Sequence, residues 1–387
     1  MSLLRPGSHR AAGFADDAAV LAALLRVEVA WAQALVAAGI ASDADAAKVA
    51  EAAAGLDVDL AALTSATEAA GNPVVPLVAM LRDAAGDAAD AVHRGLTSQD
   101  VVDTALMLLA RDAVVRVRAD LVATGDALAG LARSHRDDLA VARTLTQWAV
   151  PTTFGLRAGQ WLAGVTGAVA RLDGLVFPVQ YGGAAGTRSL LAHLAGPGAG
   201  RAGAALAATL GLTATDLPWH TCRGALTGVG DALTTATDAV GVLAADVLLL
   251  GRPEVAEVRE GAVAGRGGSS TMPHKQNPVL SVLVHAAAQR APGLAAQLHL
   301  SAAGAVDERP DGAWHAEWPV LTELLELAVT AASQAAELVT GLHVDTSAMA
   351  ARVDAAAAAG ALDTRGHVGD AGRLVDLAIA HWEETRA

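Results

Sequence analysis

The strongest constraint on the fold is a series of long segments rich in helix-forming apolar residues and poor in helix breakers. Residues 98–134 contain no proline and carry Val101, Leu106 and Leu109 at helical spacings. As an α-helix this segment would be roughly 55 Å long, since each residue adds about 1.5 Å. Further long helices are expected over residues 17–38, 154–175, 226–250, 278–303 and 314–342. No segment alternates with period two between turns, so the sequence predicts an all-α, long-helix bundle.

Several of these segments are apolar nearly all round, which predicts burial on every side. One chain of this size cannot easily bury such long helices on all faces, so we expect a bundle completed by other subunits of a homo-oligomer. Two of the expected helices contain a proline, Pro292 or Pro319, at which we expect a kink or a break.

Composition excludes some classes of protein. The 387 residues are 53% hydrophobic and 18% charged, whereas a disordered chain needs low hydrophobicity and high charge. The formal net charge of −14 disfavours general nucleic-acid binding, which usually needs a basic face. An acidic small molecule remains possible as a substrate if cations cluster locally.

Three features predict a cytoplasmic protein. Cys222 is the only cysteine, so no intrachain disulfide or zinc cluster can form, and we expect a small core residue there. The first 20 residues lack the apolar run of a secretory signal. The longest apolar stretch, residues 228–250, is interrupted by three aspartates, which argues against a membrane span.

The most specific segment is residues 265–278, GRGGSSTMPHKQNP. Its glycines permit mobility, and it contains adjacent serines, a histidine and Lys275, one of only two lysines in the chain. A purely structural interpretation is a flexible connection before a helix that Asn277 caps and Pro278 begins. That interpretation does not explain the serines, the histidine and the lysine, so we favour a functional loop.

A second segment, residues 93–100, supports two interpretations. Thr97 and Asp100 fit a capping box at the start of the long helix. The hydroxyls at this helix start, with His93 and Arg94, would also make a good receptor for a carboxylate. Both interpretations can hold together.

The remaining polar segments are less specific. Residues 142–155, around Trp148, resemble a polar turn between helices, and residues 307–318 a solvated turn with two packed indoles. The other histidines lack ligand spacing, so no metal is expected. The glycines of residues 182–186 follow no strand, so no dinucleotide cofactor is expected either.

Three of these segments resemble one known superfamily. GSSTMPHKQNP resembles the signature loop of the fumarase/aspartase superfamily, and GLTSQDVVDTA and RTLTQWAVPTTFG resemble its other two active-site regions in the same order. Within the superfamily, GNPVVPLV, PVQYGGAAGT and GAWHAEW are most similar to the bacterial 3-carboxy-cis,cis-muconate cycloisomerases. The resemblance covers residues 10–345.

The resemblance implies an all-α homotetramer of the fumarase/aspartase type, with active sites built by three subunits. It predicts an N-terminal helical domain over residues 1–105 and a central long-helix domain over residues 106–342. Residues 343–387 would form a short C-terminal helical segment, smaller than is usual in the superfamily.

The resemblance also implies the site residues. It assigns the proton transfer to Ser269, and the contact with a carboxylate substrate to polar residues that include Thr97, Ser98, Gln147, Lys275, Asn277 and Arg309. His93 joins these substrate-binding residues as part of the carboxylate receptor. Ser270 and Trp148 are expected to shape the pocket.

The chemistry of the superfamily narrows the expected reaction. Its members add or remove a group β to a carboxylate through a carbanion, and expelling hydroxide or an amine needs a general acid. Leu145 and Trp148 occupy the positions at which members with those leaving groups carry a histidine. Opening a lactone expels a carboxylate with a pKa near about 4, which needs no protonation.

We therefore expect a cycloisomerase of protocatechuate (β-ketoadipate) catabolism, which closes a small tricarboxylate, 3-carboxy-cis,cis-muconate, to 4-carboxymuconolactone. An adenylosuccinate-type lyase is the enzymatic alternative, although these loops offer few cations for a phosphate. A structural or scaffold protein on the same fold is the non-enzymatic alternative, and the intact loop around Ser269 disfavours it.

Overall fold

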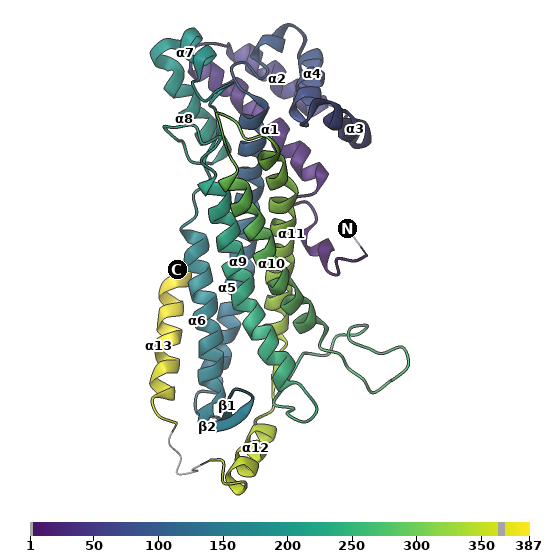
Figure 1. Ribbon diagram of the computed structural model, residues 1–387, viewed down its shortest axis with the longest axis vertical. Coiled ribbons are helices and arrows are strands. Elements are labelled where there is room, and N and C mark those ends of the chain that lie inside the picture. Colours follow the sequence, from purple (N-terminus) through teal and green to yellow (C-terminus); the bar gives the residue numbers. More distant parts are fainter. Residues whose placement is uncertain (1–2, 363–367) are drawn as a thin grey trace.

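The computed structural model describes residues 3–362 and 368–387 as an elongated α-helical bundle. Figure 1 shows that its long helices run along the longest axis of the molecule. Each lies within a few residues of an expected segment: α5 (Ser98–Ser134), α6 (Phe154–Asp173), α9 (Gly224–Leu250), α10 (Val279–Ala303) and α11 (Gly312–Thr340). The prediction of an all-α, long-helix bundle is confirmed.

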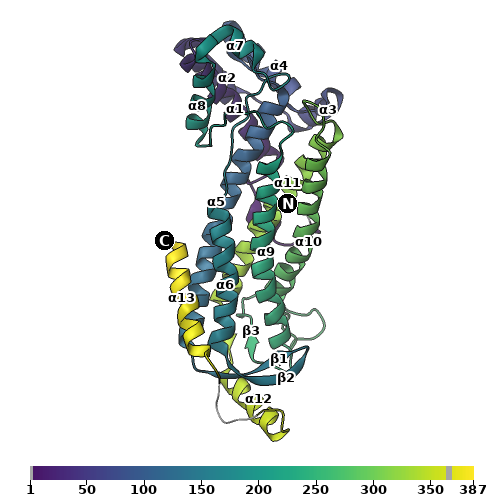
Figure 2. The same ribbon diagram turned by 60° about the vertical axis from the view of Figure 1, so that its left-hand side comes forward.

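Short helices gather at one end of the bundle, which both ribbon views place at the top (Figures 1 and 2). This end contains α1 (Asp17–Ala37), α2 (Asp43–Gly55), α3 (Leu60–Ala70), α4 (Val74–Ala85), η2 (Gly86–Ala91), α7 (Ser189–Ala195), η3 (Gly196–Gly198) and α8 (Ala199–Leu210). The N-terminal turn η1 (Ser8–Ala11) lies lower, against α11. Helix α5 begins at this end and runs without interruption through residue 105, where the expected domain boundary falls.

The opposite end carries the strands and the C-terminal helices. β1 (Leu139–Thr144) pairs antiparallel with β2 (Gln147–Thr153), and β3 (Val258–Arg259) pairs with β4 (His343–Val344). The chain ends with α12 (Thr346–Ala358) and α13 (Ala371–Arg386), and α13 packs against α6. The expected polar turn over residues 142–155 is thus wrong. An irregularity in the pairing between Val141 and Arg143 breaks the alternation that would have indicated a strand.

The two helix starts that matter for the site are capped differently. Thr97 and Asp100 form the expected capping box of α5. The prediction that Asn277 caps α10 is wrong, because the Glu260 carboxylate accepts the amides of the first turn at 3.2 and 2.6 Å. The Glu260 carboxylate, from outside the helix, therefore caps α10 in place of the Asn277 side chain, and its negative charge complements the positive end of the helix dipole.

Neither internal proline ends its helix. Pro292 lies inside α10 and Pro319 inside α11, and both helices continue past them. These helices pack against each other and against α9. Tertiary packing thus outweighs the lost backbone hydrogen bond, and the expected break does not occur.

The core consists mainly of alanine, valine and leucine from the long helices. Small residues let the helices approach closely: a Cβ added to Gly241 of α9 would lie 2.4 Å from the Cβ of Ala288 of α10. Cys222, expected in the core, is exposed. It precedes Arg223 in a short connection whose buried side is occupied by the arginine, so the cysteine faces outward.

Two helices, α1 and α9, are long and apolar enough to cross a membrane by length and composition alone. Half of the most apolar window of each is buried inside the bundle, and core helices of soluble proteins pass the same test.

Candidate active site

A buried network of charges fixes the start of α5. Arg223 donates to the Asp103 carboxylate at 2.7 and 2.9 Å and to Glu317 at 2.6 Å, and none of these side chains is more than 1% exposed. Burial alone would lower the pKa of Arg223, but the two carboxylates outweigh it and hold that pKa above its ordinary value. The network joins α5, α11 and the connection before α9.

Asp100, one turn earlier, draws a glycine loop onto the same helix start. Its carboxylate accepts the amides of Gly182 and Gly183, each at 2.8 Å, and lies 2.8 Å from His220 Nε2. A Cβ on Gly182 would lie 2.6 Å from the ring of His220, so only glycine fits there. Sequence reasoning missed this network and recognised Asp100 only as a helix cap.

Four of the expected site residues lie at this end, and we call them the α5-end group: His93, Thr97, Ser98 and Arg309. Thr97 is buried and Ser98 half-buried at the start of α5. Arg309 donates to the carbonyl of Ala184 at 2.8 Å, next to the glycine loop. His93 lies four residues before the Thr97 cap and contacts the buried Glu28 carboxylate of α1. Together these residues place cationic and hydroxyl groups at a helix N-terminus, which suits a carboxylate.

The expected catalytic serine lies in the connection between β3 and α10, residues 261–278, which we call the serine loop. It projects from the side of the bundle in Figure 1. The Ser269 Oγ accepts the amides of Thr271 and Met272 at 3.4 and 3.2 Å. Two amide dipoles aimed at this oxygen favour negative charge on it, as a serine acting as a base requires.

The other expected residues of the serine loop differ in exposure. Ser270 and Lys275 are exposed, whereas Asn277 is half-buried and donates to the carbonyl of Gly267 at 3.0 Å. The base of the loop is tied to α11, because Arg266 donates to Glu337 at 2.5 Å. Lys275 therefore presents its charge to the outside of an anchored loop.

Gln147 and Trp148 follow the turn of the β1–β2 hairpin, and both are exposed. Close to the turn, Arg143, which pairs with Trp148, donates to the fully buried Glu257 at 2.6 Å, and Arg157 lies 3.6 Å from the same carboxylate. Burial lowers the pKa of Arg157. This ion cluster anchors the hairpin to the bundle, and residues 144–148 around the turn remain exposed on a single chain.

A single chain does not assemble all these residues. The α5-end group lies at the end where α5 begins, whereas the serine loop and the hairpin lie toward the other end (Figures 1 and 2). Each chain therefore carries separate parts of the expected site.

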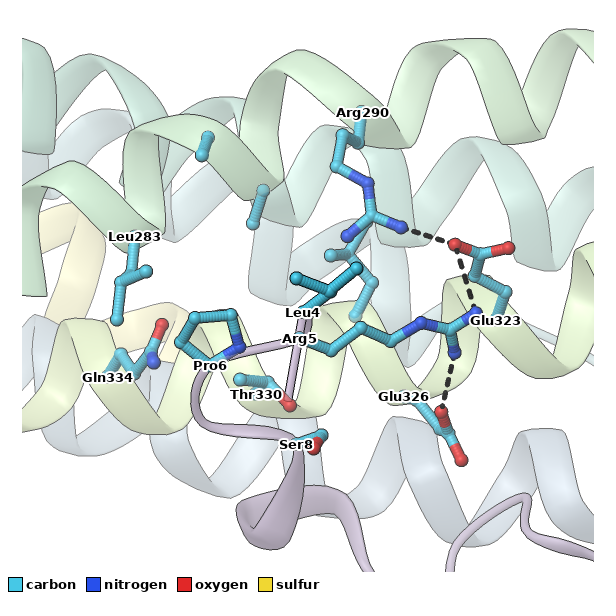
Figure 3. Close-up of a pocket in the computed structure, with 13 residues that line it drawn as sticks. Leu4, Arg5, Pro6, Ser8, Leu283, Arg290, Glu323, Glu326, Thr330 and Gln334 are labelled. Carbon is cyan, nitrogen blue, oxygen red and sulfur yellow. Dashed lines mark hydrogen bonds and ion pairs between the residues drawn. The ribbon is translucent and has the colours of Figure 1, made fainter. Parts of the chain in front are cut away.

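A cavity of about 190 Å³ lies elsewhere, between the N-terminal segment, α10 and α11 (Figure 3). Its arginines, Arg5 and Arg290, are paired with Glu323 and Glu326, and it contains none of the expected site residues. Among residues 3–362 and 368–387, no group of three or more acidic, histidine or cysteine side chains is arranged to hold a metal ion.

Comparison with known proteins decides the family. A family model described as "Lyase" matches residues 14–293. The chain belongs to this lyase family of the fumarase/aspartase superfamily. Nitrosuccinate lyase of Streptomyces davaonensis is 48% identical over 88% of this chain and 73% of its own length. The 3-carboxy-cis,cis-muconate cycloisomerase of Bradyrhizobium diazoefficiens is 40% identical over 91% of this chain and 78% of its own length.

The fold of this lyase-family chain also matches solved structures. The 3-carboxy-cis,cis-muconate lactonizing enzyme of Pseudomonas putida superposes with a TM-score of 0.86 at 29% identity, covering 96% of both chains. These relatives support an enzyme of the fumarase/aspartase superfamily, and the serine loop and the α5-end group are its candidate site regions.

Proposed function

We propose that this enzyme breaks or forms a bond β to a carboxylate when the departing group is a weak base. The observation that carries the proposal is Trp148, an exposed indole at the hairpin position where water- and amine-eliminating members of the superfamily carry an imidazole. An indole cannot protonate a leaving group. The reactions that remain practical are those whose leaving group departs as a stable anion.

Nitrosuccinate is the first candidate substrate, because the relative with that name shares 48% identity with this chain. Ser269 would take the proton from the carbon next to one carboxylate. The electron pair of that C–H bond would form the double bond of fumarate, and the C–N bond would break to release nitrite. Nitrite is a much weaker base than hydroxide or an amine, so it leaves as an anion without first being protonated.

Lys275 and Asn277 would bind the carboxylate that receives the negative charge of the carbanion. In this intermediate the carboxylate carries two negative charges, and a lysine with an amide donor stabilises it electrostatically. The α5-end group would hold the second carboxylate at the helix N-terminus.

A cycloisomerase acting on 3-carboxy-cis,cis-muconate is the second candidate, favoured by four relatives of that name at 36–43% identity. A substrate carboxylate oxygen would attack the diene, and Ser269 would then give its proton to the resulting carbanion. The reverse step expels a carboxylate, so this reaction also needs no acid at position 148.

The separate parts of the site lead us to propose a homotetramer with active sites shared between subunits. Valines and leucines of the long helices remain exposed on one chain, among them Val115 at 62%, Val242 at 61% and Leu300 at 68%. Burial of these side chains against other subunits would provide part of the association energy. As its relatives are metabolic enzymes, we place the enzyme in the cytoplasm.

Assays of the purified protein test the substrate. Nitrite release from nitrosuccinate and loss of diene absorbance from 3-carboxy-cis,cis-muconate are measured in parallel, with Ser269→Ala as the control for contaminating activity. Serine-dependent nitrite release supports the first candidate, and serine-dependent lactonisation alone supports the second. Cleavage of adenylosuccinate with neither activity would contradict both.

A further inference from the structure

The side chain of Glu28 is a carboxylate in a buried, apolar environment. It lies in the middle of α1 beside the buried Val27, and its side chain has no exposed surface. A buried charge needs a partner to offset its lost hydration. In the described part of the chain, one partner is found: Oε1 lies 2.7 Å from Nδ1 of His93, while Oε2 is buried without a hydrogen bond.

The backbone holds His93 in an unusual conformation. Its φ of 59° lies in the left-handed region that non-glycine residues seldom occupy. The neighbouring peptides are anchored on both sides, because Arg82 donates to the carbonyl of Val92 at 3.2 Å and Trp31 donates to that of Arg94 at 2.9 Å. Strain that the surroundings enforce in this way is typical of functional sites.

The contact with Glu28 determines which ring nitrogen is free. When Glu28 is ionised it can only accept hydrogen bonds, and the 2.7 Å contact then requires the proton on Nδ1 of His93. Among the described residues, the hydrogen bond found for this ring is the one from Nδ1 to Glu28. The ring keeps 16% of its side-chain surface exposed, four residues before Thr97 at the start of α5.

We propose that Glu28 is a positioning residue, which orients His93 so that Nε2 contacts a carboxylate of the substrate. This inference rests on the proposed function, since it assumes a carboxylate at the α5-end group. With a proton on Nε2 the ring donates a charged hydrogen bond, and Glu28 supplies the balancing negative charge from the buried middle of α1.

Kinetics of Glu28→Gln and His93→Gln test the role in binding. Glu28→Gln keeps the shape and an acceptor for Nδ1 but removes the charge. We expect its KM to rise about 10- to 100-fold, the worth of a charged hydrogen bond, while kcat stays within about threefold. Because Glu28 acts through His93, the double variant should be no worse than His93→Gln alone.

Val27→Ala is the matched control, since it removes buried methyl groups from the same helix without touching the imidazole. It should lower Tm and leave KM unchanged, and its effects should add to those of His93→Gln. If Glu28→Gln instead behaves like Val27→Ala, Glu28 is only a structural residue and the proposal is wrong.

NMR of protein labelled with ¹⁵N-histidine separates this proposal from the proposed function. The His93 signals, identified by their loss in His93→Gln, should show a protonated Nδ1 in the wild type and a mixture of tautomers in Glu28→Leu. Fumarate, used as a dicarboxylate probe, should shift the Nε2 signal. An unprotonated Nδ1, or no shift with fumarate, overturns the role of Glu28. If Nδ1 is protonated and fumarate shifts the Nε2 signal, but the enzyme turns over neither candidate substrate, the role of Glu28 stands and only the proposed function is contradicted.

Discussion

At the scale of single residues, the site depends on placing charge where water is excluded. Arg223 is fully buried between two carboxylates, and Glu28 and Glu257 are fully buried beside a histidine and two arginines. The partners of each buried charge are distant in sequence. Arg223, for example, lies between Asp103 of α5 and Glu317 of α11, which are far apart along the chain. No local pattern could have revealed these pairs, whereas Ser269 and Lys275 stand in a short recognisable motif.

Ser269→Ala should abolish most turnover because it removes the group that moves the proton. We expect kcat to fall on the order of a hundredfold or more, with KM changing little. Steady-state kinetics on the active substrate provide the check, and Thr271→Val, which removes an exposed hydroxyl of the same loop and keeps the backbone amide, is the control. Near-normal turnover in Ser269→Ala would assign the proton transfer to another residue.

Arg223→Leu should destabilise the fold strongly, because it leaves Asp103 and Glu317 buried without their cation. The expected loss is about 3–5 kcal/mol in the free energy of unfolding, measured by denaturant titration. Arg116→Leu, which removes a half-buried ion pair with Asp120 within one helix, should cost no more than about 0.5 kcal/mol. Equal losses in the two variants would show that the buried network contributes little.

At the scale of elements, apolar periodicity predicted the long helices and their ends because helix formation depends on local spacing. The hairpin was missed since its pairing is irregular between Val141 and Arg143 and Pro151 lies within β2. The cap of α10 was missed because Glu260 lies 20 residues before the amide that it meets at 3.2 Å. The sequence suggested a shared role for Gln147 and Ser269 only by resemblance, because they stand in separate segments, the β1–β2 hairpin and the serine loop, and no local pattern links the two.

The anchoring of the serine loop should depend on pH. Hydrogen bonds from Arg10 and then Arg266 hold the pKa of Glu337 below its ordinary value of 4.5. A carboxyl whose pKa is lower in the fold stabilises the fold above its ordinary pKa, and this contribution is lost as the pH falls through the lowered pKa.

Hydrogen exchange of the serine loop measures this effect. At neutral pH the loop of Glu337→Gln should exchange faster than that of the wild type, and the difference should shrink once the pH falls below about 4. Exchange in the middle of α9 serves as the internal control. Equal exchange of the two loops at neutral pH would show that Glu337 does not anchor the loop.

At the scale of the whole molecule, the separation of the α5-end group from the serine loop is the central architectural fact. If sites are shared between subunits, Ser269→Ala and Thr97→Val damage different parts of each site. Mixed tetramers of these two inactive variants should contain some sites with both parts intact and regain up to about a quarter of the wild-type activity, as random assembly predicts.

Mixing the two variants after mild denaturation and refolding, with each variant refolded alone as the control, tests this prediction. Sedimentation should show a tetramer throughout. A stable, active monomer at micromolar concentration, or mixtures without regained activity despite exchange of subunits, would contradict shared sites.

We propose that this lyase-family enzyme expels only weakly basic groups, because Trp148 occupies the position at which water- and amine-eliminating relatives carry an acid. The most direct measurement compares kcat/KM of the wild type and of Trp148→His for nitrosuccinate, 3-carboxy-cis,cis-muconate, malate and adenylosuccinate. We predict that the wild type acts on at least one of the first two and on neither malate nor adenylosuccinate. Trp148→His should change the active reaction by no more than about a hundredfold, as expected for altered packing. Cleavage of adenylosuccinate or dehydration of malate by the wild type, with nitrosuccinate and carboxymuconate untouched, would show that the enzyme expels strongly basic groups without an imidazole at position 148.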